Sequence, residues 1–437
     1  MASATKIHLS PATDSGAFST GVREDTARVA SELLQEDMMK HHVFFNDRGF
    51  HNHIVHMILS LYALGATPED IRAGWERSTV YQRPVYPTDS SIVDALQDQA
   101  KFQQCFGKEV HYPNFLAFFQ REIDSKGVGA VLNEYVFAGD VRAESMLCRV
   151  FGGLLHPFIH LGYGLEFKQP AIVAQALAQA AVHNDRVGRN FSLPAEQMAE
   201  ETGKPGQKSL RQLLDEVRQN QTLTRGVKVS DRIPDGIMDR APQEMLKYAA
   251  QYTVSASQIA EREADMINTV VYYTSAAQRK NKANKLDFFL LHCVNSSIFF
   301  CKILRLPYLT EQTKLRLLEW KGRLDLLIYV SAGSPDLLLD EVTSYPAKTD
   351  WNTVFSRGLA HPTDDGHLVK FLRAIAHGER VCRAFEDSKM PISGDAWLRI
   401  GNMAIDSTAG PDGERTMWVR SAGFDEAWEN VSAHARL

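Results

Sequence analysis

Apolar residues along most of the chain recur at the three- and four-residue spacing of amphipathic helices. The first half carries this pattern at 28–42, 53–66, 91–102, 114–123, 129–139, 144–155 and 170–183. The second half resumes it at 261–279, 284–304, 310–333 and 366–377. Strand-like alternation is nearly absent from the sequence and no repeat period is visible, so we predict an all-α fold that is not a solenoid.

Two stretches depart from the helical pattern. Residues 1–22 are rich in Ser, Thr and Ala, and we expect them to form a flexible N-terminal arm. Residues 186–245 are polar and contain several Pro and Gly, which favours a loop-rich excursion between two helical halves. The sequence therefore predicts a single large helical domain over 23–437 with a polar loop insertion near its middle.

Composition and charge narrow the class of protein. The 437 residues are 44% hydrophobic and 23% charged, which is ordinary for a folded globular protein. The formal net charge of -5 comes without any long Lys/Arg stripe, which argues against nucleic acid as a partner. The five cysteines are far apart and form no Cys-x-x-Cys pair, so we predict neither a disulfide framework nor a structural zinc site.

The two ends of the sequence bear on its location. The N-terminus lacks the apolar core of a secretion signal, and the longest apolar stretches are too short to span a bilayer, so we expect a cytoplasmic protein with no membrane span. The last three residues, Ala435-Arg436-Leu437, resemble the Ser-Lys-Leu class of peroxisomal address. A peroxisomal location is therefore the alternative expectation.

Nucleotide-binding and hydrolase motifs are missing from the sequence. The glycine-rich stretch 152–164 has the wrong spacing for the G-x-G-x-x-G fingerprint and follows a helical pattern, so we expect no Rossmann domain. The sequence also has no P-loop, no G-x-S-x-G elbow and no H-E-x-x-H pair.

Histidines are the candidate metal-binding or catalytic residues. His53 and His56 are three residues apart at the start of an apolar helix, and His156 and His160 are four apart in another segment. Both spacings place two imidazoles on one helix face, which suits the binding of one cation. Pro157 disfavours a continuous helix through this second pair, so we expect a kink there.

His292 stands alone in a strongly apolar segment. A buried imidazole needs a partner, because an unsatisfied buried polar group costs roughly 1 to 3 kcal/mol. From the sequence, His292 is either a metal ligand or a hydrogen-bonded core residue.

The segment 364–377 places His367, Lys370 and His377 within a narrow arc of one helix. Lys370 is unusual in such a group, because a protonated ammonium repels a cation and has no acceptor. In a metal site it would be a neutral amine, a hydrogen-bonding neighbour of the ligands, or a carbamylated lysine with carboxylate oxygens.

Six further histidines are expected at the surface or at helix ends: His8, His41, His42, His111, His183 and His434. The spacings alone support a helical bundle with a histidine-rich metal centre, or with histidines that satisfy core hydrogen bonds.

Four blocks of the sequence resemble the questin oxidase-like family of fungal anthraquinone metabolism. They are GFHNHIVHMILSLYALGA at 49–66, LLHPFIHLGYGLEFKQPAIVAQALAQAAVH at 154–183, FFLLHCVNSS at 288–297 and DDGHLVK at 364–370. The resemblance runs from about residue 40 to about residue 430, and HPFIHLGYGLEF is its most specific part.

The resemblance implies a helical oxygenase of fungal secondary metabolism that opens the central ring of a questin-like anthraquinone to a benzophenone, in a Baeyer-Villiger-type cleavage. It implies a non-haem Fe(II) held by histidines and a carbamylated lysine, with O₂ as co-substrate. By motif position, the implied metal ligands are His56, His156, His160, His292 and Lys370. Lys370, His367 and His53 are the implied catalytic residues, and His53 and His367 are also the reserve ligands.

Other positions bear on the substrate. Cys293-Val294-Asn295 stand where the family pattern leads us to expect small residues and a Thr, which leaves the substrate's substituents open. A planar aromatic polyketide needs an apolar, aromatic-lined pocket. The candidate walls are Tyr163, Phe288, Phe289 and Trp418.

Three hypotheses follow from the sequence. The first is an iron-dependent oxygenase, with NADPH as its reductant if only one oxygen atom is incorporated. The second is an NADPH-dependent, metal-free Baeyer-Villiger monooxygenase, against which the missing nucleotide fingerprint counts. The third is a non-catalytic helical ligand-binding protein. Metal analysis distinguishes the first from the other two.

Overall fold

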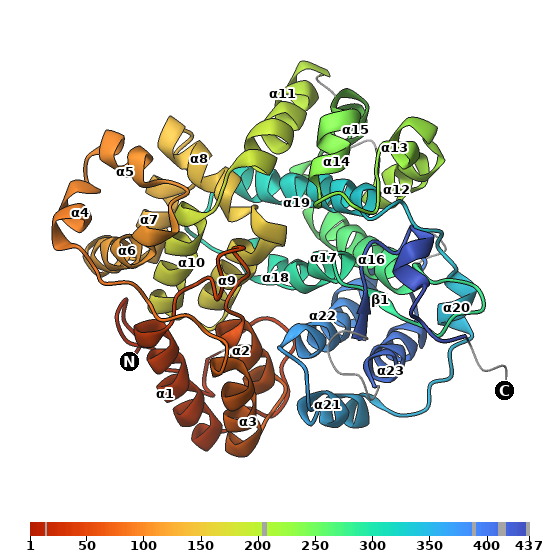
Figure 1. Cartoon of the computed structure of the whole chain (residues 1–437), viewed down its shortest axis with the longest axis horizontal. Helices are drawn as coiled ribbons and strands as arrows, with labels where there is room; N and C mark the ends of the chain where they lie inside the picture. Colours follow the sequence, from red (N-terminus) through yellow and green to blue (C-terminus); the bar gives the residue numbers. More distant parts are fainter. Residues whose placement is uncertain (14, 203–207, 387–389, 410–416, 434–437) are drawn as a thin grey trace. The chain divides into compact units, whose positions relative to one another are not determined.

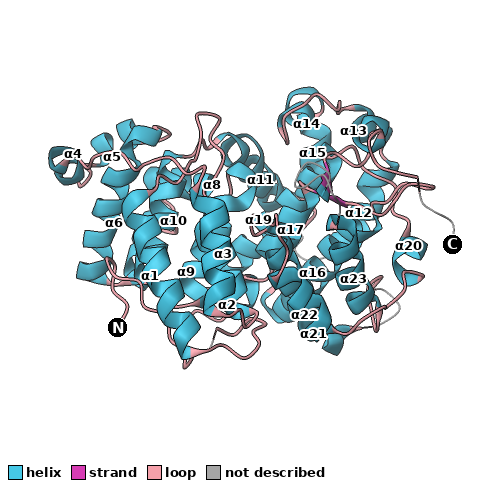
Figure 2. Ribbon diagram, turned by 60° about the horizontal axis from the view of Figure 1, so that its bottom comes forward, coloured by secondary structure: helices cyan, strands magenta, loops and turns pink. Residues whose placement is uncertain are grey.

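The computed structural model describes residues 1–13, 15–202, 208–386, 390–409 and 417–433. The C-terminal tripeptide with its peroxisomal resemblance, and His434, lie outside the described residues. Helices dominate the described chain, which confirms the all-α prediction (Figures 1 and 2). The chain divides into two compact units. The first comprises Met1–Arg189, Cys301–Thr310 and Asp365–Lys370, and the second comprises Asn190–Phe300, Glu311–Asp364 and Phe371–Leu437.

Ten helices of the described chain lie wholly in the first unit. They are α1 (Glu24–Lys40), α2 (Ile54–Ala63), α3 (Pro68–Thr79), α4 (Ser90–Ala95), α5 (Gln99–Cys105), α6 (Tyr112–Lys126), α7 (Val128–Tyr135), α8 (Val141–Val150), α9 (His156–Glu166) and α10 (Pro170–Val182). Helix α10 packs against α9 and α6, while α1, α2 and α3 pack on one another (Figure 1). Every residue of α2 and of α9 is buried, which is the environment expected for helices that are apolar on nearly all sides.

Local capping explains where several helices begin. Thr67 and Asp70 form a capping box at the start of α3. The pattern at 91–102 predicts one helix, but the chain forms α4 and α5. The reason is Asp98, whose carboxylate accepts the backbone N–H of Lys101 and so starts a new helix at Gln99.

The second unit is also helical. Its helices are α11 (Leu193–Thr202), α12 (Leu210–Gln219), α13 (Gln221–Arg225), α14 (Asp235–Arg240), α15 (Pro242–Ala249), α16 (Ile259–Ala276), α17 (Leu290–Ser297), α19 (Glu311–Ser331), α20 (Leu339–Thr343), α21 (Trp351–Leu359) and α23 (Ala396–Thr408). Helix α16 contacts α12, α17, α19 and α20. Two short parallel strands, β1 (Leu286–Asp287) and β2 (Trp418–Val419), pair just before α17.

Two of the boundaries between the units fall within α18 (Phe300–Ile303) and α22 (His367–Cys382), and a third falls within the turn at Gly188–Ser192. The described chain also contains short helical turns, which are 3-10 helices except for one π turn. They are η1 (Glu109–His111), η2 (Gly153–Leu155), the π turn η3 (Gly188–Ser192), η4 (Ala256–Gln258), η5 (Arg383–Phe385) and η6 (Asp425–Trp428). Among the described helices, none is both long and apolar enough to cross a membrane.

The stretch 186–245 holds more helix than its polar composition predicts, namely α11 to α14 and the start of α15. Helix α12 shows why. Ser209 and Gln212 form a capping box, and Leu210, Leu213 and Val217 bury one narrow apolar face while the other faces stay polar. The predicted boundaries of this excursion and of the single domain stay predictions.

The N-terminal residues are described without a helix as far as Arg23, yet parts of them are anchored on α1. Ile7 and Leu9 are buried, and their backbone N–H groups donate to Gln35 and Ser31. A groove of about 970 Å³ lies between this segment and α1, lined by none of the candidate site residues.

Candidate metal centre

The chain makes a left-handed turn immediately before α9. Gly153, Leu154 and Leu155 have φ values of 53°, 52° and 66°. A left-handed conformation costs a non-glycine residue roughly 1 to 2 kcal/mol, so this turn stores strain. The kink expected at Pro157 is thus a full break between α8 and α9, and Pro157 lies in the first turn of α9, where proline is tolerated.

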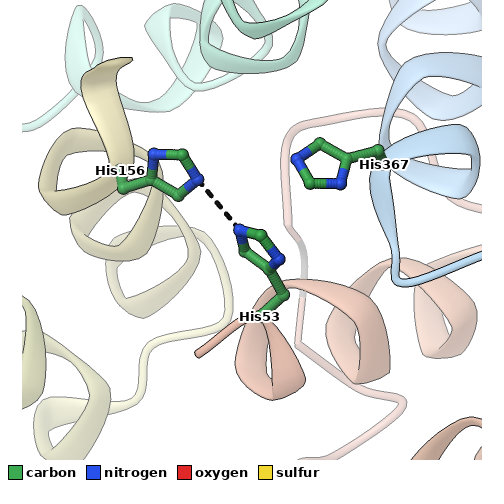
Figure 3. A group of neighbouring side chains, drawn as sticks. All are labelled: His53, His156 and His367. Carbon is green, nitrogen blue, oxygen red and sulfur yellow. Dashed lines mark hydrogen bonds between the residues drawn. The ribbon is translucent and has the colours of Figure 1, made fainter. Parts of the chain in front are cut away.

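This turn orients His156, the first residue of α9. Its Nδ1 lies 2.6 Å from the carbonyl oxygen of Gly153. Its Nε2 lies 2.9 Å from Nε2 of His53, the residue that precedes α2 (Figure 3). The contact between α2 and α9 therefore joins two of the predicted site residues.

His367, at the start of α22, completes a group of three histidines. Possible ligand atoms of His53, His156 and His367 all lie within 4.8 Å of one another, and all three residues are buried. Figure 3 shows the three rings converging from three separate elements.

Asp365 holds two members of this group. One carboxylate oxygen lies 2.6 Å from Nδ1 of His367, and the other lies 3.3 Å from Nδ1 of His53. Carboxylates that accept the second ring nitrogen of metal-binding histidines are a recurrent arrangement in metalloproteins.

Burial favours the neutral form of His53 and His367. Desolvation is the main cause that lowers the pKa of His53 and that of His367, the latter to about 3, and a positive charge on Lys370 contributes to both shifts in the same direction. Burial alone would raise the pKa of Asp365, but the neighbouring His367 and His53 outweigh it and hold that pKa well below its usual range. Near neutral pH, an Asp365 carboxylate therefore faces two neutral imidazoles.

His56 and His160 extend the cluster. Their ring centroids are 5.2 Å apart, and both residues are buried. Desolvation and the charge of Lys370 hold the pKa of His56 well below its ordinary value. Neither ring nitrogen of His56 has a hydrogen-bond partner among the described residues. Burial also lowers the pKa of His160 to about 4.

The predicted residues Lys370 and His292 belong to different units. Lys370 is buried in the first unit, and its charge acts on His53, His56 and His367. His292 is buried in α17 of the second unit, with Nδ1 2.6 Å from the carbonyl oxygen of Phe288. The role of each as a metal ligand stays a prediction.

The candidate pocket walls are also divided. The Tyr163 ring stacks on His56 with centroids 5.4 Å apart, and its hydroxyl lies 2.5 Å from the Ser60 hydroxyl. The other three belong to the second unit, where Phe288 packs edge-on against His292 and Trp418 is buried in β2.

Sequence reasoning placed His42 and His183 at the surface or at helix ends. His183 does stand at the end of α10, and the side chains of both residues are buried. The ring of His42 contacts the Glu109 carbonyl and accepts the Phe44 N–H, while His183 faces His51. Aromatic neighbours from distant segments cover both rings, and no local pattern reveals such neighbours.

Sequence reasoning also missed Asp365. Its position two residues before His367 in the block DDGHLVK was the available signal. Spacing could not show that its second oxygen reaches His53.

Comparison with known proteins places the chain in a family. Residues 50–375 match the family described as Questin oxidase-like. The chain is 41% identical to the Baeyer-Villiger oxidase ptaJ of Pestalotiopsis fici, over 92% of each chain. It is 37% identical to a questin oxidase of Aspergillus terreus, over 99% of this chain and 98% of that one. It is 36% identical to a questin oxidase of Aspergillus fumigatus, over 99% of this chain and 100% of that one.

These similarities extend over nearly the whole length of both partners, and the matched region includes His53, His156 and His367. They confirm the resemblance seen in the four sequence blocks: the chain belongs to the questin oxidase-like family.

Proposed function

We propose that the protein is a non-haem iron-dependent oxygenase that cleaves the central ring of a questin-like anthraquinone to a benzophenone in fungal secondary metabolism. Membership of the family makes the chain an oxidoreductase. The names of its relatives, questin oxidase and Baeyer-Villiger oxidase, support an aromatic polyketide substrate and a ring-cleaving reaction.

One observation carries the proposal for a metal. Nδ1 of His156 lies against a carbonyl oxygen, and Nδ1 of His53 and of His367 lie against the Asp365 carboxylate. Since these oxygens are acceptors, each Nδ1 carries the ring proton, and Nε2 of each neutral ring then carries no proton and is the atom that can bind a cation. Two bare nitrogens 2.9 Å apart repel each other unless a cation lies between them.

Neutral imidazoles are the nitrogen ligands that divalent iron accepts. We propose Nε2 of His53, His156 and His367 as ligands, with His56 as the next donor because its buried nitrogens find no partner in the described chain. His156 and His56 are common to this set and to the set implied by the sequence resemblance, which gave His53 and His367 as reserve ligands. An iron held here would supply the redox chemistry for O₂ that a flavin supplies in other oxygenases.

Lys370 needs a particular protonation state in this proposal. A charged ammonium close to His53, His56 and His367 would oppose the binding of a cation. We propose that its buried amine is carbamylated, which would offer carboxylate oxygens, or is neutral and moves a proton during the reaction. Metal binding that depends on added bicarbonate would identify the carbamate.

The chain's own groups have defined roles in this account. Asp365 holds the Nδ1 protons of His53 and His367, and the Gly153 carbonyl holds that of His156. Tyr163 packs against His56 and, with the other buried side chains, helps to exclude water from the histidines. Exclusion of water protects reactive oxygen chemistry from side reactions.

The electron balance defines two forms of the reaction. If one atom of O₂ enters the substrate beside the quinone carbonyl, a reductant such as NADPH supplies two electrons and the other atom leaves as water. If both atoms enter the product, no external reductant is needed.

Questin incubated with the protein under ¹⁸O₂, with and without NADPH, tests the proposal. The expected result is an ¹⁸O-labelled benzophenone that disappears in His156→Ala protein. Labelling by one or two atoms distinguishes the two forms. Ring opening at full rate by chelator-treated protein with NADPH would instead establish the metal-free monooxygenase.

A further inference from the structure

Two buried histidines outside the proposed ligand set lie directly behind His156. The His51 ring stacks flat on the His156 ring, with centroids 3.9 Å apart and planes 5° apart. Nε2 of His51 lies 2.6 Å from Nε2 of His183, so one ring donates its proton to the other. The outward nitrogen of His51 is therefore engaged with His183.

The His51–His183 pair is held in place by its neighbours. Phe44 packs edge-on against both rings, at centroid distances of 5.4 Å and 5.2 Å. The Arg149 guanidinium donates to the His183 carbonyl, which anchors the chain just after α10. Neither ring can turn without displacing Phe44 or breaking the contact between the two imidazoles.

The left-handed turn closes against the same pair. A Cβ at Gly153 would lie 2.4 Å from Cε1 and 2.6 Å from Nε2 of His183, and 3.0 Å from Cε1 of His51. The turn that supplies the carbonyl acceptor for His156 is therefore packed directly on the pair. The edge of the His156 ring is fixed by Gly153 and its face is fixed by His51.

We propose that His51 and His183 are positioning residues, which fix the plane of the His156 ring and thereby set the metal affinity of the three-histidine group without binding the metal themselves. This inference rests on the proposed function. The face of the His51 ring would perform this role, because its Nε2 is hydrogen-bonded to His183.

Two substitutions of His51 distinguish a role in stacking on His156 from a role as a metal ligand. His51→Phe keeps a flat ring over His156 but has no nitrogen, whereas His51→Ala removes the ring. His111→Phe is the matched control, because His111 is a partly exposed histidine of the same unit whose ring pairs with Asn114. Metal-free protein is titrated anaerobically with Fe(II), and in parallel with Co(II), whose visible absorption reports ligand geometry.

We expect His51→Ala to weaken Fe(II) binding by roughly 10- to 100-fold, the usual effect of losing a group that orients a metal ligand. His51→Phe should stay within about 3-fold of the wild type, because the stacking surface remains. The Co(II) absorption should shift in His51→Ala and stay unchanged in His111→Phe. Thermal unfolding of each metal-free variant reports whether the fold is retained.

Equal and severe loss in His51→Ala and His51→Phe would make His51 a ligand and overturn the positioning role. Wild-type Fe(II) affinity and an unshifted Co(II) spectrum in folded His51→Ala would overturn the positioning role but not the proposed function, because the protein would still bind the metal. A wild-type protein that binds neither metal would overturn the proposed function together with this inference.

Discussion

At the level of single residues, the feature that determines whether the histidines can bind a metal is which ring nitrogen carries the proton. In three histidines far apart in the sequence, Nδ1 lies against an oxygen acceptor and carries the ring proton. Nε2 of each ring is then the nitrogen that can bind a metal ion. The sequence identified His53, His156 and His367 as candidates, because their spacing and motif are local features. It could not identify their tautomers, which depend on Asp365 and on the Gly153 carbonyl.

Asp365→Asn tests the role of this carboxylate. An amide presents only one acceptor oxygen and no charge, so it cannot hold both Nδ1 protons as a carboxylate does. We expect Fe(II) affinity to fall roughly 10- to 100-fold, with the unfolding temperature of the metal-free protein nearly unchanged. Asp364→Asn, a change at the adjacent residue, is the control. Unaltered Fe(II) affinity in Asp365→Asn would remove Asp365 from the account.

A second carboxylate gives the protein a pH-dependent stability. Burial raises the pKa of Asp265 from 3.8 to about 6, although the Leu210 N–H donates to it at 2.6 Å. The folded protein therefore keeps this proton to higher pH than the unfolded chain does. Stability falls as pH rises from about 4 to about 6, by about 3 kcal/mol in total, and then levels off.

Asp265→Asn removes this titration. The free energy of unfolding of the variant, relative to the wild type, should rise by about 2 to 3 kcal/mol between pH 4 and pH 7. Urea unfolding of both proteins at the two pH values measures the difference. If the difference in unfolding free energy between the variant and the wild type were the same at pH 4 and at pH 7, the pKa of Asp265 would not be raised by folding.

At the scale of elements, the most informative segment is the left-handed turn between α8 and α9. The apolar pattern predicted most of the helices, and Pro157 correctly indicated a discontinuity. Three successive residues with positive φ, two of them leucines, could not be predicted. Leucine disfavours this conformation, and only packing from distant segments such as His183 maintains it.

Gly153→Ala tests this turn. The new Cβ would overlap the His183 ring, so we expect a loss of about 1 to 3 kcal/mol in stability and a weaker affinity for Fe(II). Gly394→Ala is a matched control, because Gly394 has a φ of 54° with nothing within 4 Å of its Cβ position. Urea unfolding and anaerobic Fe(II) titration measure both effects. Equal losses of stability in the two variants would mean that backbone strain alone, without the contact to His183, explains the change.

At the scale of the whole molecule, the first unit gathers its site from distant parts of the sequence. It takes Asp365–Lys370 from far along the chain, and this segment carries Asp365, His367 and Lys370. Periodicity finds helices one at a time and cannot reveal such an assignment, so the sequence predicted the helical class but not this division. Three of the four blocks that carry the family resemblance contribute to the first unit, namely 49–66, 154–183 and most of 364–370, whereas 288–297 lies in the second unit.

We propose that the buried histidines hold an iron that the reaction requires. Elemental analysis of untagged protein, combined with the rate of anthraquinone ring opening before and after chelation, tests it most directly. We expect about one iron per chain, which is lost together with activity on chelation and is absent from His53→Ala and His156→Ala proteins that remain folded. Less than about a tenth of an iron per chain in protein that keeps full activity in chelator would contradict it.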